Sequence, residues 1–339
     1  MKILAIETSC DETAAAVVSK NSNESHVEIL SNIVASSLML HSKTGGIIPD
    51  VAAREQLKFI VPVIKRAIKA SKLKIEDLDA IAITQGPGLI GSLLIGVETA
   101  KTLSFLWKKP IIPVNHLFGH IYANFINKEN NIRFPAIALL VSGGHTDIVL
   151  MKDYNNFKWL GGTRDDAAGE SFDKIGRLLN LPYPAGPTME ALSKNGDEKA
   201  FNFPRPMIGS KDFDFSFSGL KAAIWRETKK IKEMDDKTVA DICACVQKSI
   251  TEVLVRKTFK AAKKYNVKSI LLGGGVAANQ KLRDEIKLQI ENSKLKIAFF
   301  YPEKSLCTDN AVMVGAYAAF HPEKKSWNMI SANPELYFD

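Results

Sequence analysis

The sequence predicts an α/β protein with mixed β-sheets, and three observations lead to this class. Short apolar runs of strand length alternate with longer segments whose apolar residues recur at helical spacing. A strand–polar turn–strand pattern occurs near the start of the chain and again near its middle. Glycine-rich turns follow three of the strands. We therefore expect two related α/β halves.

The first half opens with a hairpin that has an unusually polar connection. Ile3–Ile6 and Ala14–Val18 are apolar runs, and Glu7–Thr13 between them is polar. The elements expected after this hairpin are, in order, a helix over Ala52–Ser71, a strand over Ala80–Thr84, a helix over Leu89–Leu106, a strand over Pro110–Val114 and a helix over Asn115–Phe125. The first domain is predicted over residues 1–125, with the C-terminal residues 310–339 packing back on it.

The second half repeats the hairpin with Ala136–Val141 and Ile148–Met151 on either side of a polar turn. Residues 153–236 form an irregular, proline-containing stretch with a helical run at Phe172–Leu179, and such long segments are usually functional. The elements expected after it are a helix over Thr238–Lys264, a strand over Ser269–Leu272, a helix over Asn279–Asn292, a strand over Lys296–Phe300 and a helix over Asn310–Phe320. The second domain is predicted over 126–309, with 153–236 as an irregular insert.

The composition is that of an ordinary globular protein. The chain has 339 residues, of which 46% are hydrophobic and 24% are charged, which excludes a disordered chain, a collagen-like repeat and a membrane bundle. Lys and Arg total 45 and Asp and Glu total 37, so the formal net charge is +8. A basic excess of this size can attract a polyanion such as tRNA, and it can equally reflect lysine-rich helix faces.

The cysteines and the start of the chain predict a cytoplasmic protein. None of the four cysteines belongs to a CxxC motif, which favours a reduced compartment over a disulfide framework. Met1–Glu7 leads directly into a strand, so we expect no secretory leader. No apolar stretch reaches the ~18–20 residues that a membrane helix needs, and we expect no membrane partner.

Two histidines and one aspartate are candidate metal ligands. His116 and His120 are four residues apart in an expected helix and share one of its faces. Such a pair can bind Zn²⁺ or Fe²⁺, or it can be a partly buried pair of core histidines. Asp309 precedes an expected helix, where it either caps that helix or completes a two-histidine, one-carboxylate site. The HExxH motif of common metalloproteases is absent.

Glycine turns and acidic residues suggest a nucleotide site. The turns at Gly86–Gly88, Ser142–Gly144 and Gly273–Gly275 can bring backbone N–H groups close to a phosphate, although tight turns also use glycine for other reasons. None matches GxxxxGK[ST] or GxGxxG, yet together they favour a nucleotide cleft between the two halves. Asp173 either accepts hydrogen bonds from ribose hydroxyls or interacts with a helix dipole, and Asp11 either serves as a base or stabilises its turn.

A series of motifs, in chain order, resembles one known family. These motifs are IETSCDET, GGIIPDVAAREQ, GPGLIGSLLIG, VNHLFGH, LLVSGGHT, DDAAGESFDKIGRLL, FSFSGLK, GGGVAANQ and CTDNAVMVG. Together they are similar to those of the universal tRNA threonylcarbamoyladenosine synthase family, the TsaD type, whose older label is O-sialoglycoprotein endopeptidase. The resemblance runs from Met1 to about Phe320 and fits the bacterial or organellar branch best.

The resemblance implies a fold and a set of site residues. The fold is the actin-like ATPase (ASKHA) fold, with two ribonuclease-H-like subdomains around a nucleotide cleft. His116, His120 and Asp309 are implied to bind one divalent metal, Fe²⁺ or Zn²⁺. The residues implied to hold an adenylate substrate are Leu140, Val141, Ser142, Gly143, Gly144, Asp173, Gly186, Glu190 and Asn279.

The implied reaction is a group transfer to tRNA. The threonylcarbamoyl group of threonylcarbamoyl-AMP would move to the exocyclic amine of the adenosine beside the anticodon, in tRNAs that decode ANN codons, and AMP would leave. Asp11 is our candidate for a base in this step. The family also implies protein partners, either a paralogous non-catalytic subunit and a small ATPase of the TsaB and TsaE types, or a second copy in a homodimer.

Three other functions remain as alternatives at this stage. The glycine turns suit a small-molecule kinase of the actin-like fold, which would phosphorylate a small acceptor with ATP. The HxxxH pair suits a metallopeptidase, although the glutamate of HExxH is missing. A non-catalytic nucleotide-binding scaffold would need neither His116 nor Asp309 for its role.

Overall fold

The computed structural model describes residues 1–126, 130–293 and 295–338. The chain divides into two compact units, Met1–Asn131 with Pro302–Asp339 (unit 1) and Ile132–Tyr301 (unit 2). Residues 127–129, 294 and 339, over which the predicted domains run, lie outside the described residues. No helix in the described part of the chain is long and apolar enough to cross a membrane.

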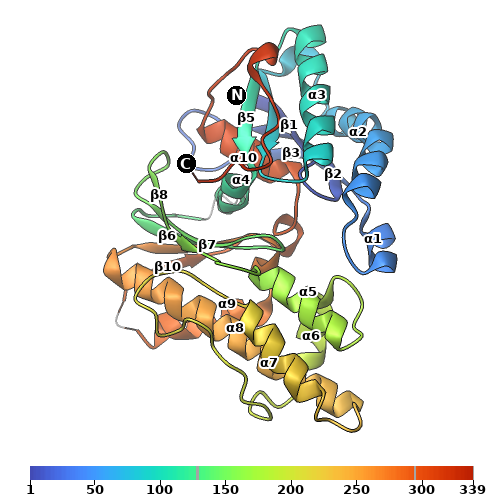
Figure 1. Ribbon diagram of the computed structural model, residues 1–339. Helices are drawn as coiled ribbons and strands as arrows, with labels where there is room; N and C mark the ends of the chain where they lie inside the picture. The colour runs from blue at the N-terminus through green and yellow to red at the C-terminus, as the bar shows by residue number, and fades with distance from the viewer. Residues whose placement is uncertain (127–129, 294, 339) are drawn as a thin grey trace. The chain divides into compact units, whose positions relative to one another are not determined.

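Unit 1 is built on a five-stranded mixed sheet of order β3-β2-β1-β4-β5 (Figure 1). Its strands are β1 (Lys2–Glu7), β2 (Glu12–Ser19), β3 (Glu28–Ser36), β4 (Ala80–Gly86) and β5 (Ile111–Asn115). The first three strands are antiparallel neighbours, whereas β4 pairs parallel with β1 and with β5. The expected hairpin of β1 and β2 is therefore present, with Ala5 opposite Ala16.

Helices cover both faces of this sheet, and alternate side chains of β1 contact them. Leu4 and Ile6 belong to a buried cluster with residues of α2 (Pro49–Ser71) and α3 (Ile90–Trp107). Ala5 points to the other face, where it approaches Gly315 of α10 (Ala311–Phe320). The remaining helical segments of unit 1 are α1 (Leu38–Thr44), η1 (Ile75–Asp77), α4 (His116–Tyr122), η2 (Ala123–Phe125), η4 (Lys304–Leu306) and η5 (Trp327–Met329).

Unit 2 repeats the same strand arrangement in a sheet of order β10-β9-β6-β7-β8. Its strands are β6 (Ala136–Val141), β7 (Thr146–Met151), β8 (Phe157–Gly162), β9 (Ser269–Gly273) and β10 (Ala298–Phe300). The β6–β7 hairpin is antiparallel, and β6 pairs parallel with β9, just as β1 pairs with β2 and β4 in unit 1. The expectation of two related halves is thus confirmed by topology.

The stretch expected to be irregular, 153–236, holds more regular structure than the sequence indicated. It contains β8, α5 (Ala168–Leu178), α6 (Ala185–Ser193) and α7 (Ser218–Thr228), so the prediction of an irregular insert is wrong for about half of it. The prolines around α6 lie before it or in its first turn: Pro184 is the residue that precedes the helix, and Pro187 is its third residue. The other helical segments of unit 2 are α8 (Asp236–Lys264), η3 (Gly275–Ala278) and α9 (Gln280–Glu291).

Candidate functional site

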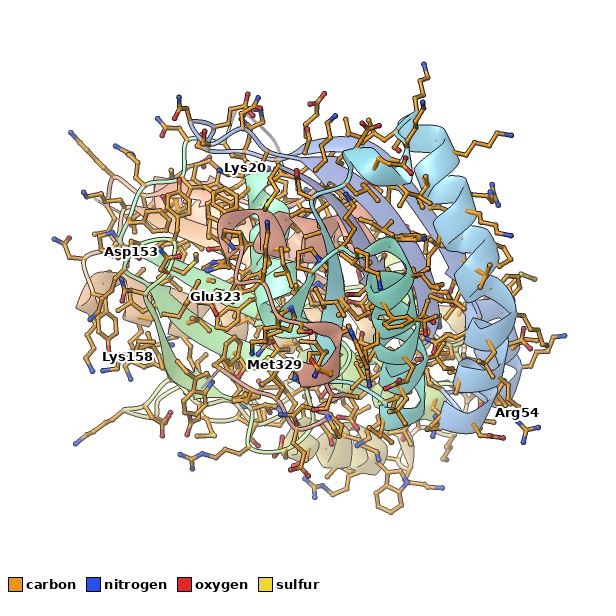
Figure 2. All side chains as sticks on the ribbon, turned by 90° about the horizontal axis from the view of Figure 1, so that it is seen from above. Lys20, Arg54, Asp153, Lys158, Glu323 and Met329 are labelled. Atoms are coloured by element: carbon orange, nitrogen blue, oxygen red, sulfur yellow. The ribbon has the colours of Figure 1, made fainter. Side chains whose placement is uncertain are left out.

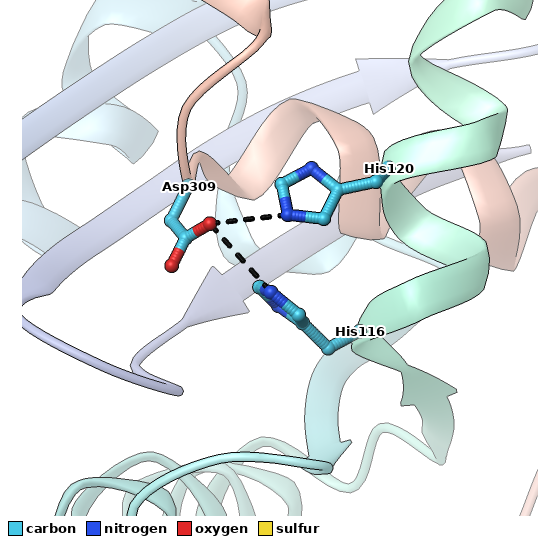
Figure 3. Close-up of side chains that lie close together, drawn as sticks. All are labelled: His116, His120 and Asp309. Atoms are coloured by element: carbon cyan, nitrogen blue, oxygen red, sulfur yellow. Dashed lines mark ion pairs between the residues drawn. The ribbon is translucent and has the colours of Figure 1, made fainter. Parts of the chain in front are cut away.

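The two histidines extend from α4, a short helix that directly follows β5 (Figure 3). The Asn115 side chain begins the helix by accepting a hydrogen bond from the Leu117 N–H at 2.8 Å. His116 and His120 are one turn apart and their ring centroids are 4.6 Å apart. Both residues are buried, with 7% and 2% of their surface exposed. The expected helical placement on one face is confirmed.

Asp309 lies opposite these rings, in the segment that leads into α10 (Figure 3). Its Oδ1 atom is 3.2 Å from His120 Nε2 and 3.6 Å from His116 Nε2. The cap of α10 is the next residue, Asn310, whose side chain accepts a hydrogen bond from the Met313 N–H at 3.1 Å. Of the two interpretations of Asp309, the capping role is therefore wrong, and its carboxylate faces the histidines.

Glu7 orients His116 from the side opposite Asp309. Glu7 Oε2 is 3.2 Å from His116 Nδ1, and because a carboxylate can only accept, Nδ1 is the protonated nitrogen. Thr84 donates a hydrogen bond to the same carboxylate oxygen at 2.6 Å. In the neutral form of His116 this tautomer presents the lone pair of Nε2 toward Asp309, as in the carboxylate–histidine–metal arrangement of metalloproteins.

The sequence reasoning missed Glu7. The sequence pattern places Glu7 in the polar turn, whereas it is the last residue of β1 and is fully buried. A glutamate directly after an apolar strand was the only sign in the sequence that it could belong to the site. Ser9, two residues on, adds a further contact, with its Oγ 3.1 Å from His116 Nδ1. The glycine turn at Gly86–Gly88 supports this contact, because a Cβ on Gly88 would lie 2.5 Å from the carbonyl oxygen of Ser9.

The charges around the two histidines act on them in opposite directions. Burial opposes the charged form of His116, but the carboxylates of Asp309 and Glu7 outweigh it and raise its pKa to about 9. Burial and the neighbouring His116 lower the pKa of His120. One ring is therefore held next to negative charge, and the other is neutral, which is the form in which imidazole binds a metal.

The group fits a metal ion on the evidence of its own atoms. One ligand atom from each of His116, His120 and Asp309 can be chosen so that all lie within 4.8 Å of one another. Among the described residues, both ring nitrogens of His120 are buried and form no hydrogen bond, although Nε2 has the approach to Asp309 given above. Two imidazoles and one carboxylate are a donor set for Fe²⁺ or Zn²⁺ that leaves coordination positions open. The group can thus hold a metal ion.

Asp11 lies in the turn between β1 and β2, and it is buried among other acidic groups. Its side chain shares hydrogen bonds with Cys10 and Glu12. Burial, together with the charges of Asp309 and Asp11, raises the pKa of both the Cys10 thiol and the Glu12 carboxyl. The structure therefore places Asp11 in the same electrostatic environment as the candidate ligand Asp309.

Unit 2 carries a second group of predicted residues at the end of β6. Leu140 and Val141 are fully buried residues at the end of β6. The turn that follows is closed by a hydrogen bond from the Ser142 N–H to the His145 carbonyl oxygen at 2.8 Å. Gly143 and Gly144 are exposed, and a Cβ on either would meet nothing within 4 Å. Their backbone is open to an approaching group.

The glycine turn after β9 lies beside the turn after β6. Gly274 adopts φ +90°, and a Cβ there would overlap the carbonyl oxygen of Val141. Asn279, which follows η3, caps α9 by accepting from the Leu282 N–H at 2.9 Å, and its amide nitrogen donates to Gln247 Oε1 at 2.8 Å. Its side chain therefore ties α9 to α8.

Asp173, Gly186 and Glu190 come from α5 and α6, which pack together. Asp173 Oδ1 accepts a hydrogen bond from the Ala185 N–H at 2.7 Å, and the Gly186 N–H also bonds to its carboxylate. Burial, only partly offset by these bonds, raises the pKa of Asp173. Glu190 Oε1 accepts from the Gln280 N–H at 2.7 Å, so α6 is linked to the start of α9. The predicted residues of unit 2 thus lie on contacting elements around the ends of β6 and β9.

Comparison with solved structures defines the class of fold. The chain is similar to HypF from T. kodakarensis, with a TM-score of 0.63, 15% identity, and coverage of 95% of this chain and 47% of that one. It is also similar to (R)-2-hydroxyglutaryl-CoA dehydratase component A of Acidaminococcus fermentans, with a TM-score of 0.53, 15% identity, and coverage of 95% and 98%. Both have the ASKHA fold, so the expected actin-like fold is confirmed. In this chain the fold also carries a candidate metal centre.

Comparison of sequences defines the family. Residues 28–316 match the TsaD family, tRNA N6-adenosine threonylcarbamoyltransferase. The protein of that name from Thermosipho africanus is 48% identical over 339 residues, which cover 99% of each chain. The one from Syntrophomonas wolfei is 47% identical over 331 residues, which cover 98% of this chain and 95% of that one. The chain therefore belongs to the TsaD family, and the resemblance drawn from its motifs is confirmed.

Proposed function

We propose that this chain transfers the threonylcarbamoyl group of threonylcarbamoyl-AMP to the N6 amine of the adenosine beside the anticodon. In this step the amine nitrogen forms a bond to the carbamoyl carbon, the bond from that carbon to the phosphate oxygen breaks, the amine loses a proton, and AMP leaves. The observation that carries the proposal is the family match over nearly the whole chain. The kinase, peptidase and scaffold alternatives have no comparable support.

We assign one divalent metal, Fe²⁺ or Zn²⁺, to His116, His120 and Asp309. When bound, such an ion supplies a Lewis acid that can polarise the carbamoyl carbonyl or bind the carboxylate and hydroxyl of the threonyl group. The chain's own contribution is to hold the ligands in place. Glu7 fixes the tautomer of His116, and α4 keeps the two imidazoles on one face.

The adenylate is assigned to unit 2. The N–H groups of Gly143 and Gly144, in the open part of the Ser142–Gly144 turn, would bind the phosphate as negative charge moves onto it with the departure of AMP. Asp173 and Asn279 hold the surrounding helices together, and the remaining acceptor capacity of Asp173 suits a ribose hydroxyl. An aromatic amine is a weak nucleophile, so positioning should supply much of the rate.

Asp11 is our candidate for the group that receives the amine proton. It is a buried acidic residue whose carboxylate already bonds to Cys10 and Glu12. A carboxylate with such neighbours can accept a proton and pass it on through hydrogen bonds. The assignment predicts that replacing Asp11 lowers the rate of transfer without lowering metal content.

The partners follow from the reaction. The tRNA would be attracted by the excess of positive charge, so its binding should weaken as salt is added. We further propose either protein partners of the TsaB and TsaE types or a homodimer, and a cytoplasmic location, the compartment in which tRNA is modified and cysteines stay reduced.

A transfer assay tests the proposal. Purified protein is mixed with preformed threonylcarbamoyl-AMP and unmodified tRNA, with and without a chelator, and the nucleosides are identified by mass spectrometry. We expect the modified adenosine to form, to disappear with the chelator and to return when Fe²⁺ or Zn²⁺ is added back. Product that forms only after TsaB- and TsaE-type proteins are added would identify an obligate complex. No product even then would overturn the proposal.

A further inference from the structure

Asp165 connects two segments of unit 2 by hydrogen bonds, and it has no role in the proposed reaction so far. It lies in the loop between β8 and α5 and accepts hydrogen bonds from a segment some fifty positions further along the chain. Its Oδ2 accepts from Ser216 Oγ at 2.6 Å and from Ser218 Oγ at 2.7 Å. Its Oδ1 accepts from the N–H groups of Phe217 at 2.7 Å and Ser218 at 3.3 Å. All acceptor positions of one carboxylate are thus directed at a single segment.

These bonds make Asp165 the cap of a helix to which it does not belong. α7 begins at Ser218, and Phe217, the residue at its cap position, provides no side-chain hydrogen bond to the helix. The first N–H groups of a helix need acceptors, and a negative charge at this end is favourable. Asp165 supplies both from a distant loop. The β8–α5 loop and the start of α7 are therefore fastened together.

The same loop is also bonded to the open glycine turn. The Gly169 N–H donates to the Ser142 carbonyl oxygen at 3.1 Å, and the Ala168 N–H donates to Thr146 Oγ1 at 2.8 Å. Gly169 packs so closely that a Cβ on it would lie 2.6 Å from the Ser142 oxygen. The Thr163 N–H donates to the Thr146 carbonyl oxygen at 2.9 Å. Both ends of the Ser142–Thr146 turn are thus held by the loop that contains Asp165 together with the first two residues of α5, into which that loop leads.

The open face of the turn has no such support. Gly143 and Gly144 are exposed, and neither would bring a Cβ into contact with another residue. Two consecutive glycines have a large choice of backbone conformations, so the direction of their N–H groups depends on how firmly the ends of the turn are held. Any group that holds the β8–α5 loop therefore also limits the motion of the turn.

We propose that Asp165 is a positioning residue for substrate binding, which acts by fixing the β8–α5 loop and, through it, the backbone N–H groups of Gly143 and Gly144. The proposal rests on the proposed function, in that the turn is assigned to the adenylate phosphate. Arg164, its neighbour, holds the same segment by an exposed ion pair with Asp214 at 2.7 Å, which contributes less because water screens it.

Steady-state kinetics of three single variants test the proposal. Asp165→Ala removes all four hydrogen bonds, whereas Asp165→Asn keeps the shape and an acceptor for the backbone N–H groups. Asp153→Ala is the matched control, because Asp153, labelled in Figure 2, also accepts several hydrogen bonds in a turn of unit 2. That turn follows β7, whereas the Ser142–Gly144 turn precedes it. KM and kcat are measured for threonylcarbamoyl-AMP at saturating tRNA, and KM for tRNA at saturating adenylate.

We expect Asp165→Ala to raise KM for the adenylate about tenfold or more, within the range that misplacement of a binding group produces. KM for tRNA should not change, and Asp165→Asn should recover most of the loss. Asp153→Ala should leave both KM values unchanged. An unchanged adenylate KM in folded Asp165→Ala would overturn the proposal. If that variant does not fold, the double variant Ser216→Ala with Ser218→Ala removes two of the four bonds and should raise the same KM by a smaller factor.

Hydrogen exchange separates this proposal from the proposed function. The backbone amides of Ser142, His145 and Gly169 should exchange faster in Asp165→Ala than in Asp153→Ala, whatever the protein catalyses. If the unaltered protein shows no transfer even with TsaB- and TsaE-type proteins present, the proposed function fails, and the exchange of these amides still decides whether Asp165 holds the turn. Equal exchange in the two variants would show that it does not.

Discussion

The His116–His120–Asp309 group of unit 1 and the Ser142–Gly144 turn of unit 2 are built in contrasting ways. The first consists of charged or chargeable side chains, two of them buried, that face one another across a few ångströms. The second consists of exposed glycine backbone, and the ends of its turn are held by hydrogen bonds to the β8–α5 loop and the start of α5. A site made of side chains should fail when one residue is replaced, whereas a site made of backbone should fail when its supports are removed.

The contrast has an energetic basis. A buried imidazole or carboxylate without a partner costs free energy, so the members of the histidine group depend directly on one another. A glycine turn contains no such groups. Ordering its backbone costs conformational entropy, and anchoring the ends of the turn reduces the conformational freedom that a bound ligand would have to remove. In unit 1, replacing a residue of the site itself should therefore have a larger effect than replacing a residue that supports it. In unit 2, replacing a supporting residue should have the larger effect.

The largest effect is expected from His120→Ala in unit 1. Loss of a ligand should remove the metal and reduce transfer by more than the ~10- to 100-fold typical of residues behind the ligands. The fold should remain, because the ring nitrogens of His120 form no hydrogen bond among the described residues. Metal content by mass spectrometry, transfer rate and circular dichroism measure the three outcomes.

The matched control for this variant is His321→Ala. His321 Nε2 is 2.8 Å from the Tyr122 hydroxyl, and its ring stacks on Tyr317 with centroids 4.3 Å apart. Its loss should lower stability and leave the metal content unchanged. Normal metal content in His120→Ala would mean that the group is not a metal site.

Glu7→Gln should have the next largest effect, although Glu7 is not a candidate ligand. Glutamine keeps the size of the side chain but lacks the charge that holds His116, so metal affinity should fall about 10- to 100-fold. Competition with a chelator of known affinity measures it. Glu28→Gln serves as control, since Glu28 is an exposed strand residue of the same unit that bonds to Ser19. If both variants bind metal like the unaltered protein, Glu7 does not support the site.

Gly274→Ala extends the comparison to unit 2 and should act on stability. An alanine there would have to adopt φ +90°, which residues with a side chain rarely do, and its Cβ would also overlap the carbonyl oxygen of Val141. Strain of this kind costs on the order of 1–3 kcal/mol. Gly275→Ala is a close control, because a Cβ at the next position would meet nothing within 4 Å. Urea denaturation of both variants measures the difference, and equal stabilities would show that the turn can relax.

These two regions also differ in how far the sequence predicts them. The spacing of His116 and His120 places both on one helix face, because the period of the α-helix alone decides this. That Asp309 faces them, and that Asn310 caps α10, depends on tertiary packing that no local pattern encodes. Glu7 was missed because a polar residue at the end of a strand resembles the start of a turn. Its burial becomes visible only in the folded chain, where His116 of α4 and Thr84 of β4 contact its carboxylate.

In unit 2, the strands were predictable, and the connections were not. Apolar runs such as Ala136–Val141 mark buried strands whatever surrounds them. Between residues 153 and 236, prolines suggested an irregular chain, yet α6, which has a proline in its first turn, and α7 form there. α7 in particular lacks a local cap and begins where Asp165 supplies one. A helix start provided by a distant residue leaves no signal at the helix itself.

The smallest expected effect is a pH dependence that tests the support of the turn without any substrate. Burial works against the Asp165 carboxylate, but the hydrogen bonds from Ser216, Phe217 and Ser218 outweigh it and lower its pKa below the ordinary 3.8. A lowered pKa in the folded state stabilises the fold above pH 3.8, and this contribution is lost as the pH falls through the lowered value. The unaltered protein should therefore exceed Asp165→Asn in free energy of unfolding most clearly near neutral pH, and the difference should shrink below about pH 3.8.

Asp153→Asn should show the same trend, because backbone bonds from Asn155 and further bonds from Asn156 lower the pKa of Asp153 as well. If the two variants share this pH dependence but only Asp165→Ala raises the adenylate KM, then the role of Asp165 lies in what its loop holds, and not in its charge. A difference between the unaltered protein and Asp165→Asn that is constant from pH 7 to pH 3 would show instead that the four bonds do not depend on the ionised carboxylate.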